Sequence, residues 1–185
     1  MVDVENIKNG NFEFQRQRYT VDYNWYEFVK LIATHPQRAI KWTDDKQRVE
    51  LLDLQVRGRT PHLAKDIINT LKDKFYKNRI SLLAFAGMTA SNKSLDIHSD
   101  GMDVYYVQWL GEVVWRILEP KDDKDKGVGK VLRPDQVEEV WSHRLVPGDA
   151  IYVPRGMFHH IIPENARVGF SFGVEDDPNP RNYIS

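Results

Sequence analysis

The chain of 185 residues contains no cysteine, which excludes disulfide bonds, thiolate nucleophiles and cysteine-ligated zinc or iron–sulfur sites. It also lacks an apolar run as long as a membrane span. The first residues, Met-Val-Asp-Val-Glu-Asn-Ile-Lys, carry neither the basic nor the apolar region of a secretion signal. We therefore expect a soluble, cytoplasmic protein with no membrane partner.

An excess of charge of one sign is absent as well. The chain has 26 basic and 27 acidic residues, so its net charge of −1 gives no indication of a nucleic-acid partner. The apolar fraction of 41% and the aromatic fraction of 11% are typical of a folded protein, and the length suits one domain. We predict a single domain over 1–185, with a helix-and-strand layer at 1–79, a β core at 80–175 and a tail at 176–185.

The order of hydrophobic patterns supports this division. Residues 11–19 alternate like a strand, 22–34 have helical spacing, and 39–42 and 49–54 are typical of two strands. Thr60-Pro61 starts a helix that we expect to reach about Tyr76. From Ile80 onward short strands follow one another at 80–85, 95–98, 104–109, 113–118, 137–141, 150–153 and 167–174. Many short strands preceded by helices predict a mainly β fold of the jelly-roll or barrel type.

His98-Ser99-Asp100 offers half of a metal site, because side chains two residues apart on a strand point to the same face. A second histidine, His159, follows a proline-rich turn and a short apolar strand. Two histidines and one carboxylate leave open positions on an octahedral metal, as non-haem Fe(II) chemistry requires. Chance alone gives about 0.9 His-x-Asp/Glu triplets for this composition, so the triplet needs its context.

That context is an ordered set of motifs. After His98-x-Asp100 come Gln108-x-x-Gly111, a tryptophan-containing strand, and Pro-Gly-Asp-x-x-Tyr-x-Pro-x-Gly-x-x-His ending at His159. Over roughly residues 81–175 this set resembles the Jumonji-C (JmjC) and cupin-like Fe(II)/2-oxoglutarate oxygenases, especially their compact bacterial and ribosomal-oxygenase branch.

The resemblance implies a double-stranded β-helix with N-terminal helices packed on the sheet. It implies Fe(II) held by His98, Asp100 and His159, with 2-oxoglutarate and O2 as cosubstrates. The implied reaction is decarboxylation of 2-oxoglutarate to succinate coupled to hydroxylation of a C–H bond. A protein side chain is the favoured substrate, and RNA or a small molecule is the alternative.

One family position is not matched. The family places a lysine or arginine for the far carboxylate of 2-oxoglutarate two residues after the glycine of Gln-x-x-Gly, where this chain has Val113. Arg116 has the opposite strand parity. Arg167 is the better substitute, because its strand alternates Arg167, Gly169, Ser171 and Gly173 on one face, and the small residues leave room for a ligand. The alternative is a solvent-facing arginine.

Three further side chains are candidates for the cosubstrate site. Tyr106 shares the parity of Asp100 and could donate its hydroxyl to the same carboxylate, although a filled barrel core explains it equally well. Ser171 occupies a position where the family often has a small polar residue near the metal. Trp115 has the parity of Val113 and forms either a cavity wall or ordinary core. The charged run 121–127 is interpreted as a solvated loop.

Two other functions remain open at this stage. Val113 favours a metal-dependent cupin enzyme that does not use 2-oxoglutarate, such as a dioxygenase that binds its substrate directly or a zinc hydrolase. A non-catalytic binding module that retains the three side chains is the other alternative. The residues do not indicate an oligomeric state.

Overall fold

The computed structural model describes residues 11–43, 47–57, 60–75, 79–89 and 95–174. Its strands form two antiparallel sheets. The larger sheet has seven strands in the order β1 (Glu13–Gln15), β9 (Ala150–Val153), β6 (Asp103–Leu110), β11 (Arg167–Val174), β4 (Ile80–Gly87), β3 (Arg48–Leu51) and β2 (Ile40–Trp42). The smaller sheet has four strands in the order β5 (His98–Ser99), β10 (Phe158–Pro163), β7 (Val113–Pro120) and β8 (Val137–Leu145). The fold is the predicted cupin-like double-stranded β-helix.

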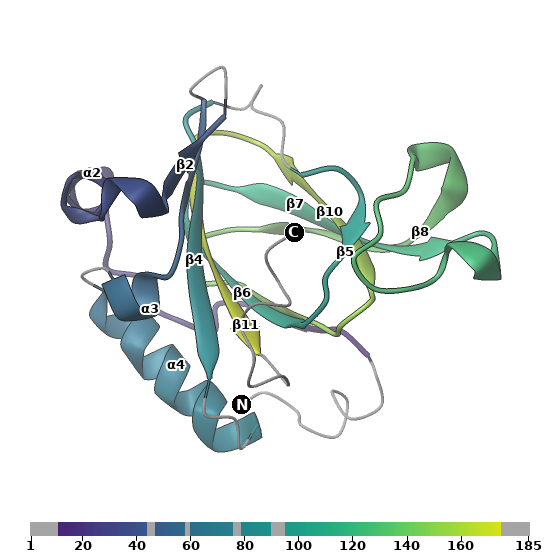
Figure 1. Ribbon diagram of the computed structural model, residues 1–185, viewed down its shortest axis with the longest axis horizontal. Coiled ribbons are helices and arrows are strands. Elements are labelled where there is room, and N and C mark those ends of the chain that lie inside the picture. The colour runs from purple at the N-terminus through teal and green to yellow at the C-terminus, as the bar shows by residue number, and fades with distance from the viewer. Residues whose placement is uncertain (1–10, 44–46, 58–59, 76–78, 90–94, 175–185) are drawn as a thin grey trace.

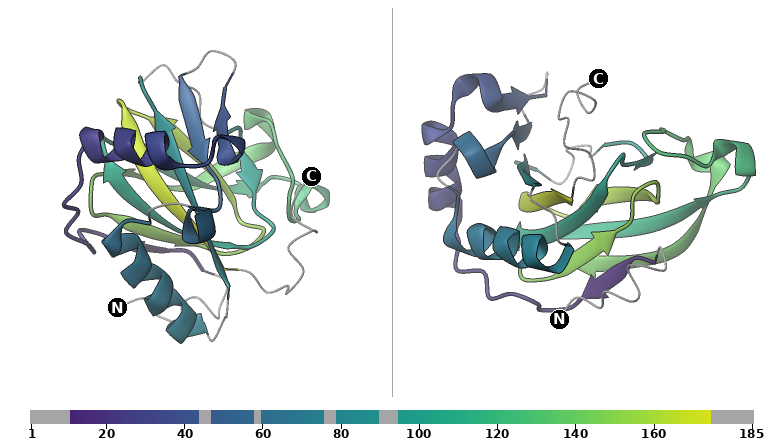
Figure 2. Two further views of the ribbon diagram at one scale, coloured as in Figure 1. Left: turned by 60° about the vertical axis from the view of Figure 1, so that its left-hand side comes forward. Right: turned by 60° about the horizontal axis from the view of Figure 1, so that its bottom comes forward.

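Three helices lie together on one side of the larger sheet: α2 (Trp25–Thr34), α3 (Leu54–Arg57) and α4 (His62–Phe75) (Figures 1 and 2). Helix α2 is capped by Asn24, whose side chain accepts from the backbone N–H of Glu27, while the Glu27 side chain accepts from the backbone N–H of Asn24. This reciprocal capping satisfies two of the helix's free N–H groups. None of the helices in the described part of the chain is long and apolar enough to cross a membrane.

Strand alternation divides the larger sheet into a helix-facing and a cavity-facing side. On β4, Leu82, Ala84 and Ala86 are buried in the core shared with the helices, while Leu83 and Phe85 line an internal cavity. Strand β11 follows the same rule, with Phe170 on the helix side. Each large apolar side chain buried under the helices contributes about 1.5–3 kcal/mol, so this layer fixes the sheet that carries the site.

The strand and helix predictions are largely confirmed, although several bounds differ: β8 extends to Leu145 and β1 covers only Glu13–Gln15. The strand expected over 49–54 ends at Leu51, because Asp53 has a φ of 56° and α3 begins at Leu54. The strand β10 was not predicted, and β5 is shorter than expected and shifted toward Ser99. Strands β1, β2 and β3 of the N-terminal layer extend the larger sheet. The predicted tail at 176–185 lies outside the described residues.

The Gln-x-x-Gly motif has a structural role at the turn from β6 to β7. The Nε2 of Gln108 donates to the carbonyls of Leu110 and Gly111 at 2.6 and 3.1 Å. Gly111 has a φ of 66°, and a Cβ there would lie 2.0 Å from the carbonyl oxygen of Ala166. Only glycine tolerates both conditions, so the motif fixes the turn that leads into the second sheet.

Candidate metal centre and adjoining cavity

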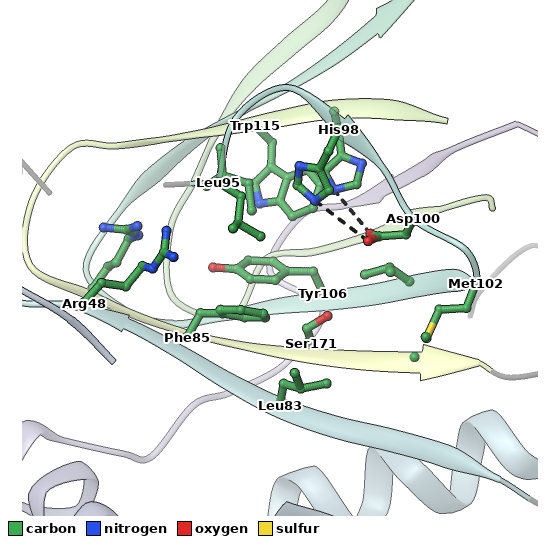
Figure 3. A pocket seen from close by; sticks show the side chains of 15 residues that line it. Arg48, Leu83, Phe85, Leu95, His98, Asp100, Met102, Tyr106, Trp115 and Ser171 are labelled. Atoms are coloured by element: carbon green, nitrogen blue, oxygen red, sulfur yellow. Dashed lines mark ion pairs between the residues drawn. The ribbon is translucent and has the colours of Figure 1, made fainter. Parts of the chain in front are cut away.

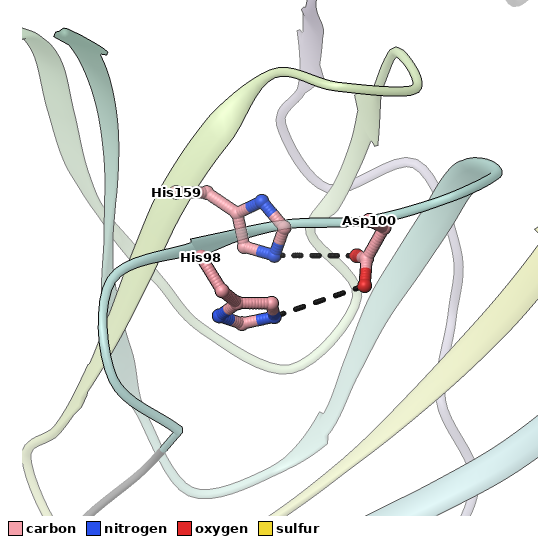
Figure 4. Close-up of side chains that lie close together, drawn as sticks. All are labelled: His98, Asp100 and His159. Atoms are coloured by element: carbon pink, nitrogen blue, oxygen red, sulfur yellow. Dashed lines mark ion pairs between the residues drawn. The ribbon is translucent and has the colours of Figure 1, made fainter. Parts of the chain in front are cut away.

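Strands β5 and β10 bring two histidines to one point. They pair antiparallel with His98 directly opposite His159, and directly opposite residues on such a pair project to the same face. The two imidazole centroids are 4.4 Å apart. Asp100 follows β5 with the same parity as His98, so all three side chains converge (Figure 4).

The donor atoms of the three side chains lie within 4.8 Å of one another. The Nε2 of His98 is 3.8 Å from Oδ1 of Asp100, and the Nε2 of His159 is 3.5 Å from Oδ2 of the same carboxylate. These distances between donor atoms are close to twice a metal–ligand bond of about 2.1 Å. All three side chains can therefore bind a single ion after small adjustments.

Backbone carbonyls set the tautomers of both imidazoles. The Nδ1 of His98 lies 2.7 Å from the carbonyl oxygen of Asp96, and the Nδ1 of His159 lies 3.1 Å from that of Met157. Because a carbonyl oxygen can only accept, both Nδ1 atoms carry the proton. In the neutral form of each ring, Nε2 then carries the lone pair and faces Asp100, which is the arrangement in which histidine ligands bind metal.

His159 is held in its neutral form. It is 3% exposed, and burial lowers its pKa to about 4, with a further lowering by His98 and an opposing effect of Asp100. Trp115 stacks on its ring, with centroids 5.1 Å apart and an interplanar angle of 20°. A neutral, rigidly packed imidazole is a metal ligand at neutral pH without first losing a proton.

The short ligand strand β5 is held from both sides. On one side it pairs with β10. On the other side the segment 127–132 lies alongside it: the Oγ of buried Ser99 donates to the carbonyl of Gly127 at 2.7 Å, and Gly129 N–H donates to the Ser99 carbonyl at 2.9 Å. Gly156 N–H also donates to the carbonyl of Asp100 at 3.0 Å. The preceding run 121–126 is mostly exposed, as the loop interpretation predicted.

A cavity of about 190 Å³ lies between the two sheets and opens next to the three converging side chains. Its walls are mainly apolar, and Figure 3 shows Arg48 on the side opposite His98 and Asp100, the side toward which the Tyr106 hydroxyl points. The fifteen lining residues come from both sheets and from the segments next to β5: Arg48, Leu83, Phe85, Leu95, His98, Asp100, Met102, Val104, Tyr106, Trp115, His159, Ile161, Arg167, Ser171 and Gly173.

Arg167 lines this cavity and is 5% exposed, so the solvent-facing alternative is wrong. Its Nη1 is buried and has no hydrogen-bond partner among the described residues. Burial lowers the pKa of Arg167 from its ordinary value; the nearby Arg48 adds to this lowering and Tyr106 opposes it. Since arginine stays protonated in proteins, the cavity contains a buried, incompletely paired positive charge.

The other predicted cosubstrate residues also line the cavity. Tyr106, Trp115 and Ser171 all contribute to its wall. The Tyr106 hydroxyl donates to Oε1 of Gln108 at 2.6 Å, so its proton is engaged within the protein rather than offered to a ligand. The Nε1 of Trp115 is buried without a hydrogen-bond partner in the described residues. Gly169 makes room for Tyr106, because a Cβ there would lie 1.8 Å from the tyrosine oxygen.

Three residues close to the site in sequence do not line the cavity. Val113 is fully buried in the apolar cluster between the sheets, so no cation occupies the family's usual position. Arg116 forms a partly exposed ion pair with Glu139 and does not line the cavity. His160 is half-buried on the opposite side of β10 from His159, and its Nδ1 has no hydrogen-bond partner among the described residues.

Arg48 is the main cavity residue that the sequence did not indicate. It lies on β3, in the N-terminal layer where no motif was found. Its strand alternates polar Arg48 and Glu50 with fully buried Val49 and Leu51. A half-exposed edge strand has the same pattern, so only the register of β3 on β4 identifies Arg48 as a cavity residue.

The fold and the cluster of two histidines and one aspartate define a cupin-like protein of the JmjC type. A family model described as "JmjC domain" matches residues 62–182, about two thirds of the chain, and the chain belongs to this family.

Two curated relatives are similar over shorter stretches. The ribosomal protein uL16 3-hydroxylase of Escherichia coli is 32% identical over 89 residues, which cover 48% of this chain and 24% of that protein. The bifunctional lysine-specific demethylase and histidyl-hydroxylase NO66 of Drosophila willistoni is 34% identical over 71 residues, 36% of this chain and 9% of that protein. The chain therefore spans a quarter or less of the length that each of these relatives has.

Solved structures show the same fold. The E. coli ribosomal oxygenase YcfD superposes with a TM-score of 0.65 at 14% identity, covering 98% of this chain and 53% of that one. A second structure of YcfD, in complex with cobalt and 2-oxoglutarate, gives a TM-score of 0.63 at 15% identity, with the same coverage of both chains.

Proposed function

We propose that the chain is an Fe(II)- and 2-oxoglutarate-dependent oxygenase that uses O2 to hydroxylate a C–H bond, with a protein side chain as its substrate. One observation carries the proposal. His98, Asp100 and His159 converge at a cavity whose other lining includes the buried, incompletely paired guanidinium of Arg167. A metal at one end and a cation at the other are what a 2-oxo diacid needs.

The three converging side chains fit Fe(II). Two imidazoles and one carboxylate form the facial ligand set of non-haem Fe(II) oxygenases. Bound iron would supply the oxygen chemistry that amino acids cannot perform. The chain's own contribution is to hold His98 and His159 in one tautomer, to keep Trp115 stacked over His159, and to surround the site with apolar walls that exclude water.

The cavity also fits the cosubstrate. Arg167 would pair with the far carboxylate of 2-oxoglutarate, because an unpaired buried guanidinium gains most from a carboxylate partner. Trp115 would donate its Nε1–H, which has no partner among the described residues, to an oxygen of the ligand, and Ser171 lines the cavity from the other sheet. Tyr106 would position rather than bind the ligand, since its proton goes to Gln108.

The relatives support a protein as substrate. The E. coli relative is named a hydroxylase of ribosomal protein uL16, and the Drosophila relative is named a demethylase and histidyl-hydroxylase. YcfD has been solved with cobalt and 2-oxoglutarate. RNA and small molecules are less supported substrates, because the balanced charge of the chain does not favour RNA and neither relative's name refers to a metabolite.

The test is conversion of 2-oxoglutarate to succinate by the chain loaded with Fe(II) in air, followed by NMR. Asp100→Asn is the matched control, because it keeps the shape of the ligand but removes its charge. We expect succinate from the parent and none from the variant. Hydroxylation is sought by mass spectrometry in a mixture of cellular proteins, as a mass increase of one oxygen.

Two results would favour a function other than the proposed one. Fe(II) binding without any 2-oxoglutarate binding or turnover would favour a metal-dependent cupin enzyme that binds its substrate directly, in line with Val113. A His98→Ala protein that binds as much Fe(II) as the parent and is equally stable would favour a non-catalytic binding module.

A further inference from the structure

The sheet that carries the two histidines continues for one short segment beyond β5. Val131 pairs antiparallel with His98 on the edge of β5 that faces away from β10, where His98 pairs with His159. These three residues therefore lie directly opposite one another in a row across the sheet. Because directly opposite residues project to the same face, the Val131 side chain lies on the face from which both imidazoles project (Figure 4).

The backbone of Val131 forms an open sheet edge. The hydrogen bonds of this pairing run from Ser99 N–H to the Lys130 carbonyl and from Leu132 N–H to the Ile97 carbonyl, at 3.0 and 2.9 Å. They flank Val131, whose own N–H and C=O therefore point away from β5, as in every non-hydrogen-bonded antiparallel pair. Neither group has a hydrogen-bond partner among the described residues. One donor and one acceptor of the sheet are thus available next to the metal centre.

The side chains at this edge are apolar and exposed. Val131 is 66% exposed, Val128 46% and Leu95 41%. Sheet edges are usually protected by charged side chains. The charged neighbour here is Lys130, but strand alternation directs it to the face opposite that of Val131, and its Nζ donates to the carbonyl of Lys124 at 2.8 Å. An unprotected edge with exposed apolar side chains is typical of a surface that binds another chain.

A groove of about 300 Å³ adjoins the edge. Leu95 and His98 line both this groove and the internal cavity, so the two are neighbours. Gly129 and Val131 line the groove as well, and a Cβ added to Gly129 would meet no atom of the described residues within 4 Å. A chain that lies in this groove therefore passes beside a candidate metal ligand.

We propose that this edge docks an extended segment of the protein substrate, which adds to the smaller sheet as a further strand beside Val131. The inference rests on the proposed function and deepens it. The open N–H and C=O select a polypeptide, because an extended peptide backbone offers both groups at the required spacing, whereas RNA has no such backbone. The substrate residue opposite Val131 continues the row of His159 and His98, so its side chain projects to the metal face.

The size of the edge favours a transient substrate over a second copy of this chain. The open groups of Val131 are one N–H and one C=O, and the groove beside them is small. Stable protein–protein interfaces bury about 1,200–2,000 Å². Two hydrogen bonds with a few apolar contacts suit a segment that must leave after each turnover.

The experiment uses short peptides selected from a random peptide library on the full chain, loaded with Mn(II) and 2-oxoglutarate. Fluorescence anisotropy gives their affinities for the parent, Val131→Pro and Val131→Thr. Proline removes the outward N–H and is tolerated at a sheet edge, whereas threonine keeps the N–H and nearly the shape of valine. We expect Val131→Pro to weaken peptide binding about tenfold, as for the loss of one hydrogen bond, and Val131→Thr to have little effect. Both variants should bind Mn(II) like the parent, because the pairing with β5 does not use this N–H.

Methylation of single peptide amides is a second measurement, which does not depend on a variant that folds. The peptide residue opposite Val131 uses its N–H in the pairing, while the N–H groups of its two neighbours point away. N-methylation should therefore weaken binding to the parent at that one position and not at either neighbour.

The possible results separate the docking edge from the proposed function. If no peptide is selected, if the parent and Val131→Pro bind the peptides equally well, or if no single N-methylation matters, the edge does not dock the substrate. Succinate formation by the parent would in these cases leave the proposed function intact. A dimer of the parent that is lost in Val131→Pro, measured by sedimentation, would assign the edge to a second copy and overturn the inference. If the parent neither binds nor converts 2-oxoglutarate, the proposed function fails and substrate docking fails with it.

Discussion

Replacing Arg167 by methionine should make the ligand-free protein more stable and the ligand-bound protein less stable. Arg167 is 5% exposed, its Nη1 has no partner among the described residues, and Arg48 places a second positive charge nearby. A buried, poorly paired charge replaced by an apolar side chain of similar length is commonly stabilising by about 1–4 kcal/mol. We expect about 1–2 kcal/mol here, or a rise in Tm of roughly 2–8 °C for a domain of this size.

The same substitution should remove the energy that Arg167 contributes to binding. Truncating one partner of a buried, charge-assisted pair costs about 2–4 kcal/mol, roughly a 30- to 900-fold loss in affinity for 2-oxoglutarate. At a concentration of 100 times its Kd, a ligand stabilises its protein by about 2.7 kcal/mol. The parent should therefore gain this amount from 2-oxoglutarate, while the variant at the same concentration gains only about 0.1–0.9 kcal/mol.

Urea unfolding of the Mn(II)-loaded chain, with and without 2-oxoglutarate, measures both effects. The order of stability should invert: the variant is the more stable protein without the ligand and the less stable one with it. Arg116→Met is the matched control, because Arg116 forms a partly exposed pair with Glu139 and such pairs contribute about 0–1 kcal/mol. A variant that is less stable than the parent without ligand, yet gains as much from it, would refute the assignment of Arg167 to an anion site.

Three further predictions concern the metal ligands, the strand that carries them and the packing around Tyr106. The pKa of His159 lies at about 4 in the folded chain and at about 6.5 in the unfolded chain, so the unfolded state binds more protons between these two pH values. The free energy of unfolding of the metal-free protein should therefore fall by up to roughly 3 kcal/mol as the pH falls from 6.5 to 4. Urea unfolding at a series of pH values measures this loss, and in His159→Gln the free energy of unfolding should depend less on pH. Gly169→Ala should cost about 1–3 kcal/mol, because its Cβ would lie 1.8 Å from the Tyr106 oxygen; unchanged unfolding would contradict the tight packing. Ser99→Ala should weaken Mn(II) binding about tenfold, because it removes the hydrogen bond from the Ser99 hydroxyl to the Gly127 carbonyl, and Ser99→Thr, which keeps a hydroxyl, should bind Mn(II) like the parent. Equal Mn(II) affinities of the parent and Ser99→Ala in a titration would show that this hydrogen bond does not support the metal ligands.

Much of the site could be predicted because it depends on local rules. Parity along a strand placed Asp100 beside His98, and the alternation around Ser171 identified the face of the last strand that lines the cavity. Parity also separated Arg116 from the cavity. Each of these inferences needs only the two-residue period of a strand, which tertiary contacts do not change.

The remainder depends on pairings between distant segments. Nothing in the sequence around Arg48 shows that β3 joins β4 in the register that sets this side chain opposite Gly87. The partner of the Tyr106 hydroxyl was also left open, because parity gives the face of a side chain but not its hydrogen-bond partner, which here is Gln108. Register and partner choice are set by packing across the whole sheet.

The replacement of the family's cation by Val113 illustrates the same limit in functional terms. Val113 begins β7 in the smaller sheet and is fully buried, whereas Arg167 begins β11 in the larger sheet. A ligand carboxylate needs a positive charge at one position in the cavity. Because both sheets line the cavity, a residue of either sheet can provide that charge. A motif position can then be lost without loss of the interaction, provided that a small-residue face elsewhere leaves room for an arginine. The small residues that follow Arg167 identified the cavity face of β11, and in the structure the space beside them is filled by Tyr106 at Gly169 and by Met102 at Gly173, so the pattern predicts the face of Arg167 and not the shape of the cavity.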